Sequence, residues 1–108
     1  MSGKTTIAPE VLISIAQLAT VSVEGVSRLT AGPVEVNRLF KKGSSRCVNV
    51  TVEDNVVYTD LYVILKKDVN VRDVCKTIQN QVARSINEMV GMEVGRVNVH
   101  VEDIDFSS

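Results

Sequence analysis

The single histidine of the chain lies in a segment where acid–base chemistry is conceivable. His100 follows Asn98 and precedes Glu102 at spacings of two, so the three side chains share one face of a predicted strand. A general base needs such polar neighbours to orient it, and a substrate proton within reach. The alternative is an exposed polar residue on an open sheet face, where such side chains usually lie. We favour this alternative and predict no catalytic residue and no enzyme activity.

Neither cysteine has the surroundings of a nucleophile or a metal ligand. Cys75 falls within the apolar stripe of a predicted helix, and Cys47 begins a predicted strand. Free cysteines in such places are commonly buried, and no neighbouring base would stabilise a thiolate. Because His100 lies on a third element, the spacing of a zinc site is absent. The six glycines form neither a phosphate-binding loop nor a GxxG clamp, so we predict neither a metal nor a cofactor.

A basic cluster in the irregular segment 24–46 is the first candidate binding surface. Arg38, Lys41 and Lys42 lie close together there. Such charges often only solvate a loop. The alternative is a contact for an acidic partner, an anionic membrane surface or nucleic acid. We predict a secondary partner contact, whose strength should fall as salt rises.

The second candidate surface lies on the predicted strand 56–66. Tyr58, Tyr62 and Ile64 occur at even spacings, which places them on the face turned away from the core. Amphipathic aromatic side chains on an uncovered sheet face are typical of interfaces. We therefore predict that these three residues form one patch for self-association or partner contact.

Two helices and three strands are expected to position these surfaces. The strands alternate valine with polar residues, and each helix carries one apolar stripe. The predicted elements are a helix over 9–23, strands over 47–53 and 56–66, a helix from a cap at Asn70 to a stop at Gly91, and a strand over 94–104. The order is α-β-β-α-β, which predicts a two-layer α+β sandwich with both helices on one face of a three-stranded sheet. We place the 47–53 strand in the centre (sheet order 2-1-3), because it is the shortest strand and the most purely valine-faced.

Length and composition limit the class of protein. The 108 residues suit a single domain over residues 1–108, and 21 valines indicate a substantial sheet. The formal net charge is −1 and aromatic residues make up 4%, which disfavours nucleic acid as a partner. No apolar run reaches the length of a membrane span, so direct membrane insertion is not expected. Few cysteines and no signal-peptide pattern favour the cytoplasm.

Several pieces of the sequence, in order, resemble the bacterial alkaline-shock (envelope stress response) protein family. A helical segment ends in Glu24-Gly25-Val26, similar to a family signature. The other matching pieces are Val57-Tyr58-Thr59-Asp60-Leu61-Tyr62-Val63, Val90-Gly91-Met92-Glu93-Val94 and Val97-Asn98-Val99-His100-Val101. The resemblance covers about residues 5–106. The pair Lys66-Lys67 and the basic middle segment depart from the family pattern and leave the particular partner open.

This resemblance implies a cytosolic stress-response domain without enzyme activity. Family members assemble into larger structures, and some are held at the inner face of the membrane by a membrane-anchored partner. We therefore expect a scaffold or adaptor that forms homo-oligomers and binds such a partner. The alternative is a small RNA- or ribosome-associated domain with KH-like element order. The family offers no agreed site residues to carry over to this chain.

Overall fold

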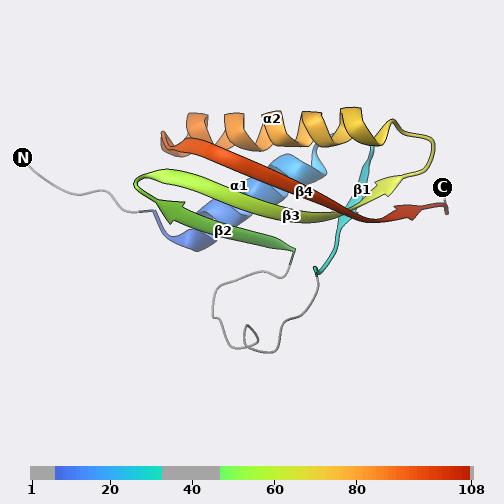
Figure 1. Cartoon of the computed structure of the whole chain (residues 1–108), viewed down its shortest axis with the longest axis horizontal. Helices are drawn as coiled ribbons and strands as arrows, with labels where there is room; N and C mark the ends of the chain where they lie inside the picture. The colour runs from blue at the N-terminus through green and yellow to red at the C-terminus, as the bar shows by residue number, and fades with distance from the viewer. Residues whose placement is uncertain (1–6, 33–46, 108) are drawn as a thin grey trace, which may run out of the picture.

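The computed structural model describes residues 7–32 and 47–107. These residues form two helices and four strands (Figure 1). Their bounds are α1 (Pro9–Val21), β1 (Val26–Leu29), β2 (Val48–Glu53), β3 (Val56–Lys66), α2 (Val71–Val90) and β4 (Glu93–Asp105). The predicted α+β sandwich is confirmed, with β1 as an additional strand in a segment that was predicted to be irregular.

The longer helix, α2, forms as its sequence predicts. The Asn70 side chain accepts a hydrogen bond from the Asp73 backbone N–H at 3.1 Å, which satisfies one of the unpaired donors of the first turn. The helix ends at Gly91, whose φ of 73° is left-handed and suits glycine. Its buried residues recur every four positions and face the core: Val74, Ile78, Val82 and Ile86.

The central strand is β3, and the predicted order with the 47–53 strand in the centre is wrong. On one side β3 pairs antiparallel with β2 along its first half and with β1 along its last part. On the other side it pairs parallel with β4 along its whole length. A central strand must have hydrogen-bonding partners on both sides, and β3 has them because β2 and β1 share one of its edges while β4 takes the other.

Strand β1 was missed because little in its sequence indicates a strand. It has four residues, and the register shifts between Val26 and Arg28. Four residues with one irregularity give almost no alternation to read. The sheet formed by the described residues therefore has four strands rather than three.

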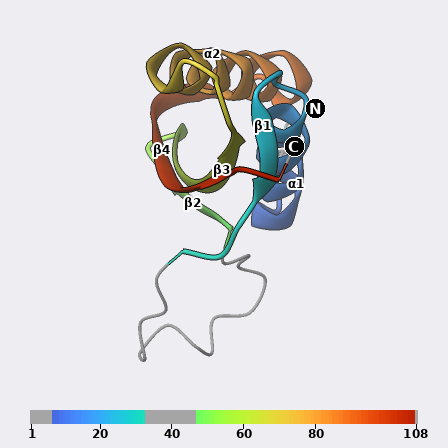
Figure 2. The same cartoon turned by 90° about the vertical axis from the view of Figure 1, so that its right-hand side faces the viewer.

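Both helices cover one face of the sheet, as predicted. Helix α1 lies behind the sheet and α2 runs above it along β4, and the end-on view shows the two helices beside each other (Figures 1 and 2). The side chains of β3 that face the helices are Val57, Thr59, Leu61, Val63 and Leu65, and all are buried. With the apolar residues of both helices they form one hydrophobic core. The opposite side of the sheet is the open face.

Replacing Thr59 by valine is expected to stabilise the protein. Thr59 is 1% exposed and faces the helices, and its hydroxyl has no hydrogen-bond partner among the described residues. Burying an unpaired polar group costs roughly 1–3 kcal/mol, and valine has nearly the same shape. We expect Thr59→Val to raise the free energy of unfolding by about 1 kcal/mol in urea titrations.

Thr20 provides the matched control. It is also fully buried, but its hydroxyl donates a hydrogen bond to the Ala16 carbonyl at 2.7 Å. Thr20→Val removes a satisfied hydrogen bond and should not stabilise. If both variants change stability in the same direction by the same amount, the unpaired hydroxyl of Thr59 carries no cost.

Candidate partner-binding surface

Three strands align a row of polar and aromatic side chains across the open face. In the register, Asp60 of β3 lies between Asn49 of β2 and Asn98 of β4. Two residues before Asp60, Tyr58 lies between Thr51 of β2 and Arg96 of β4. Two residues after it, Tyr62 lies opposite His100 of β4. Paired residues point to the same side of a sheet, so these side chains share one surface. We call Tyr58, Asp60, Tyr62, Asn98 and His100 the tyrosine patch.

Asp60 is the polar centre of the tyrosine patch. Its Oδ1 accepts a hydrogen bond from Asn98 Nδ2 at 3.1 Å and lies 3.1 Å from His100 Nε2. The side chains of Asp60 and His100 are 41% and 42% exposed. When His100 is protonated, this contact becomes an ion pair in a solvated setting, where such pairs contribute little. The main effect of the two contacts is to hold the Asn98 amide and the His100 ring in fixed orientations.

Both tyrosine rings lie over glycines of neighbouring segments. A Cβ on Gly32 would come within 2.7 Å of the Tyr62 ring, and a Cβ on Gly95 would come within 2.7 Å of the Tyr58 ring. Tyr62 also stacks on His100, with ring centroids 4.7 Å apart and planes 15° apart. Aromatic side chains that cover glycines in this way lie along the sheet. The patch is therefore a flat and preorganised surface.

The predicted site residues have three different outcomes. Tyr58 and Tyr62 share the open face as expected, and each is half-buried. Ile64 does not extend the patch, because it is only 8% exposed between the paired β1 and β4. The basic cluster at Arg38, Lys41 and Lys42 lies outside the described residues.

Sequence reasoning missed Asp60 and both glycines. The even spacing of Tyr58, Asp60 and Tyr62 was visible in the sequence, but contact with His100 requires the parallel register of β3 and β4. The predicted polar neighbour Glu102 instead occupies a register irregularity near the end of β4. His100 therefore belongs to a polar cluster, but the cluster is centred on Asp60.

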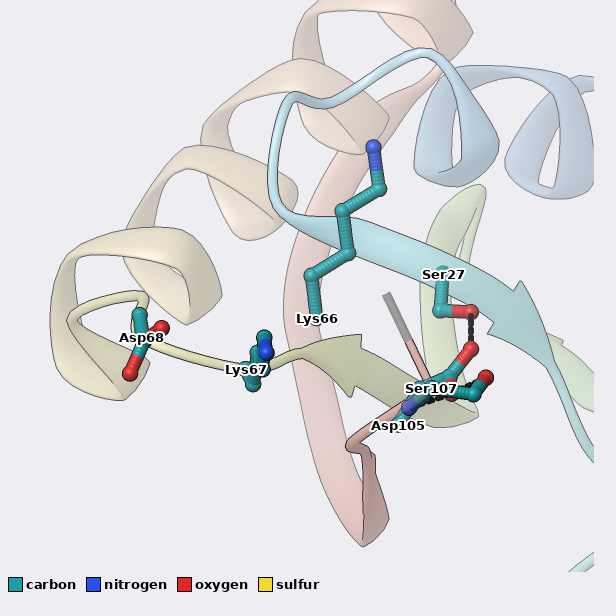
Figure 3. A pocket seen from close by; sticks show the side chains of 6 residues that line it. All are labelled: Ser27, Lys66, Lys67, Asp68, Asp105 and Ser107. Carbon is teal, nitrogen blue, oxygen red and sulfur yellow. Dashed lines mark hydrogen bonds between the residues drawn. The ribbon is translucent and has the colours of Figure 1, made fainter.

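A shallow hollow of about 490 Å³ lies where the strands end, beside Ser27, Lys66, Lys67, Asp68, Asp105 and Ser107 (Figure 3). Asp105 accepts hydrogen bonds from the hydroxyl of Ser107 at 2.6 Å and of Ser27 at 2.7 Å. These bonds lower the pKa of Asp105 from 3.8 to about 2. Figure 3 shows Lys66 and Asp68 pointing away from the carboxylate. The hollow holds a satisfied carboxylate that ties β1 to β4, and its lysines do not converge on a ligand.

The other chemically capable side chains do not gather into a site. Cys47 and Cys75 are half-buried, and desolvation raises the pKa of the Cys75 thiol. Within residues 7–32 and 47–107, no group of three or more His, Cys, Asp and Glu side chains could hold a metal ion. In the same part of the chain, no helix is long and apolar enough to cross a membrane.

A comparison with models of protein families tests the resemblance that the sequence segments indicated. The model of the alkaline shock protein family, described as having a "cell envelope-related function", matches residues 1–106. The chain belongs to the alkaline shock protein family. Two curated relatives from Bacillus subtilis (strain 168) have similar extents. The uncharacterized protein YqhY is 28% identical over 98% of this chain and 80% of its own length. The uncharacterized protein YloU is 27% identical over 94% of this chain and 88% of its own length.

Solved structures show the same fold at low sequence identity. A MamM CTD variant in its cadmium form superposes with a TM-score of 0.64 and 12% identity, covering 91% of this chain and all of that chain. At this identity the likeness concerns the fold alone. The comparisons indicate no catalytic family for this member of the alkaline shock protein family, and they give the KH-like RNA-binding alternative no support.

Proposed function

We propose that this protein is a non-catalytic scaffold or adaptor of the envelope stress response. It self-associates, and it binds a membrane-associated protein partner through the tyrosine patch. The observation that carries the proposal is the open face itself, where two amphipathic aromatic side chains flank a hydrogen-bonded carboxylate on the side of the sheet that the two described helices leave uncovered. The cell envelope-related description of the family supports the same setting.

The fixed geometry of the patch favours binding. Ordering a side chain at an interface costs roughly 0.5–1.5 kcal/mol, and rings already held in place avoid most of that cost. Tyr62 is held by Gly32 and by the stacked His100, and Tyr58 is held by Gly95. Each ring can bury its apolar body against a partner while its hydroxyl forms a hydrogen bond. Asp60 adds one negative charge at the centre, which favours a partner with a basic or hydrogen-bond-donating side chain there.

The location in the cell and a second contact, through the basic cluster, are part of the same proposal. The protein works in the cytoplasm and is held at the inner face of the membrane by its partner. The basic cluster of Arg38, Lys41 and Lys42 increases the rate of encounter with an acidic surface, an effect that salt screens over about 8 Å at physiological ionic strength.

A crosslinking pull-down from the cell of origin tests the proposal. Tyr58→Ser combined with Tyr62→Ser removes both rings, and we expect the amount of captured membrane-associated protein, identified by mass spectrometry, to fall at least about tenfold. Thermal unfolding of the purified variant must show that it remains folded.

Met89→Ser is the matched control for this experiment. Met89 is 68% exposed at the end of α2, so its replacement also removes exposed apolar surface, but from another side of the molecule. Capture should be unchanged. A folded tyrosine variant that captures the same membrane-associated proteins as the wild type would contradict the assignment of the open face.

A further inference from the structure

One long edge of the sheet has no partner within the described chain. Strand β4 pairs with β3 on one side only. It has thirteen residues, whereas an ordinary strand has about five or six. A long edge strand presents a row of backbone donors and acceptors that readily pair with another strand, and proteins usually protect it with charged residues, proline, β-bulges or short length. Strand β4 has two register shifts and several acidic residues toward its ends, but its regular stretch, residues 96–101, contains neither lysine nor proline.

The hydrogen bonds of the neighbouring strand identify the free backbone groups. The N–H of Tyr62 donates to Cys47 and its carbonyl accepts from Thr30, so Tyr62 serves the β1 and β2 side. The backbone N–H and C=O groups of successive residues point to alternate sides of a strand. Those of Leu61, which is paired with Val99, therefore point toward β4. In a parallel pair, the backbone of Leu61 then bonds to the residues on either side of Val99. The backbone N–H and carbonyl of Val99 therefore point away from β3, toward the free edge.

An independent contact confirms this alternation. The Val97 carbonyl, two residues before Val99, accepts a hydrogen bond at 3.0 Å from the Gln79 side chain of α2, outside the sheet. Val97, Val99 and Val101 therefore present their backbone groups at the free edge. The carbonyl of Val97 has a second lone pair, so the Gln79 contact does not exclude a strand partner.

We propose that this edge pairs antiparallel with β4 of a second copy of the chain, about a two-fold axis through Val99. In this register Val99 faces its own symmetry mate and Val97 faces Val101. These outward-facing residues form the hydrogen-bonded pairs of the new ladder. The inference specifies the self-association within the proposed function, and it does not depend on the partner protein.

Charge complementarity selects this register. Counted along the two strands, it brings Arg96 opposite Glu102 of the second copy, at the end of the regular stretch of β4, and by symmetry it does so twice. Both side chains are exposed, and neither has an ion-pair partner among the residues that the structure describes. A shift of the axis by one residue in either direction would leave Arg96 opposite His100 or Ile104 instead. Opposite charges directly across an antiparallel pair stabilise it.

The irregularities of β4 delimit the same stretch. Its register against β3 skips Gly95 and Glu102, so the regular ladder runs from Arg96 to Val101 and the two Arg96–Glu102 pairs lie at its ends. Extra residues at both ends of an edge bend the strand and limit further pairing. The two-fold arrangement uses both free edges of this stretch, which closes the dimer and does not continue into a fibre.

The dimer would combine two binding surfaces. A two-fold axis perpendicular to the sheet keeps both helix layers on one side and both tyrosine patches on the other. Two patches on one continuous sheet can engage two sites of a membrane-bound partner at once, which increases avidity without new contacts.

Charge exchange across the axis tests the pairing. By sedimentation equilibrium at about 0.1 M salt we expect the wild type to form a dimer. Arg96→Glu or Glu102→Arg alone places two like-charged pairs in the interface and should weaken the dimer at least about tenfold. The combined variant, Arg96→Glu with Glu102→Arg, restores opposite charges and should recover the wild-type dimer. Recovery cannot be explained by damage to the fold.

A disulfide at the axis gives a second measurement. In a chain with Cys47→Ser and Cys75→Ser, Val99→Cys should form a covalent dimer on oxidation, because hydrogen-bonded pairs have Cα atoms about 5.5 Å apart, within the range of disulfides. Val97→Cys alone should not crosslink, since its opposite residue is Val101.

Two results would overturn the inference. One is a wild type that stays monomeric up to high micromolar concentration. The other is a combined charge variant as weak as the single variants, together with equal crosslinking at positions 97 and 99. The tyrosine double variant should remain dimeric in either assay, so a failed pull-down experiment and a failed dimer experiment are distinguishable.

Discussion

The protein carrying Ile78→Asp is expected to be unfolded at room temperature. Ile78 has no exposed surface and lies in the middle of α2, within the core formed by both helices and β3. A carboxylate at this position would be buried without a partner, which costs several kcal/mol even after its pKa adjusts. A domain of this size has a total stability of roughly 5–15 kcal/mol, so one such change removes most of it.

The control for this prediction lies two residues further along the same helix. Asn80 is exposed, so Asn80→Asp adds the same charge at the surface, where changes usually stay within about 0.5 kcal/mol. Circular dichroism and thermal unfolding of the two variants measure the difference. If Ile78→Asp melts within a few degrees of Asn80→Asp, the apolar stripe of α2 does not face the core.

Alternation along the strands was sufficient to predict which residues face the helices. Valines at every second position identified the buried side of β2 and β4, and the helical spacing identified the buried stripe of α2. Both signals depend only on local geometry, because side chains alternate in a strand and recur every three to four residues in a helix. For the same reason Tyr58 and Tyr62 could be placed on the open face from the sequence.

The neighbours of each strand could not be predicted in this way. Pairing is decided by the hydrogen bonds between segments that are far apart in the chain, and residue types at an edge or in the centre overlap. The valine-rich face of β2 suggested a central strand, but β2 is short and its last three residues are exposed. Strand length did not identify the centre either, because β4 is longer than β3 and pairs with it alone, whereas β3 pairs with each of the other three strands.

The candidate site depended on the same missing information. Asp60 and His100 are forty residues apart in sequence and meet only because α2 returns the chain to form a parallel strand beside β3. Gly32 and Gly95 each have a tyrosine ring packed over the backbone, and nothing in the residues around them indicates it. A single sequence shows that a glycine is present and does not show which ring packs against it.

Replacing Gly25 by alanine is expected to destabilise the protein by about 3 kcal/mol, through backbone strain and overpacking together. Gly25 lies between α1 and β1 with a φ of +104°, which alanine rarely adopts. A Cβ there would lie 2.8 Å from a methyl group of Val74, at the start of α2. The Gly25 carbonyl also accepts a hydrogen bond from the Lys66 N–H at 2.8 Å, so the segment cannot move away freely. These constraints give a physical reason for glycine in the sequence Glu24-Gly25-Val26.

Gly91→Ala separates the two causes. Gly91 also has a positive φ, +73°, but no atom lies within 4 Å of the position that a Cβ would take. Its substitution therefore adds left-handed strain alone, about 1–2 kcal/mol. Thermal unfolding should show a decrease in Tm for Gly25→Ala roughly 1.5 to 3 times that for Gly91→Ala, on the order of 12–24 °C against 4–16 °C. Equal decreases would mean that Val74 yields without cost, and that the glycine is required only for its backbone conformation.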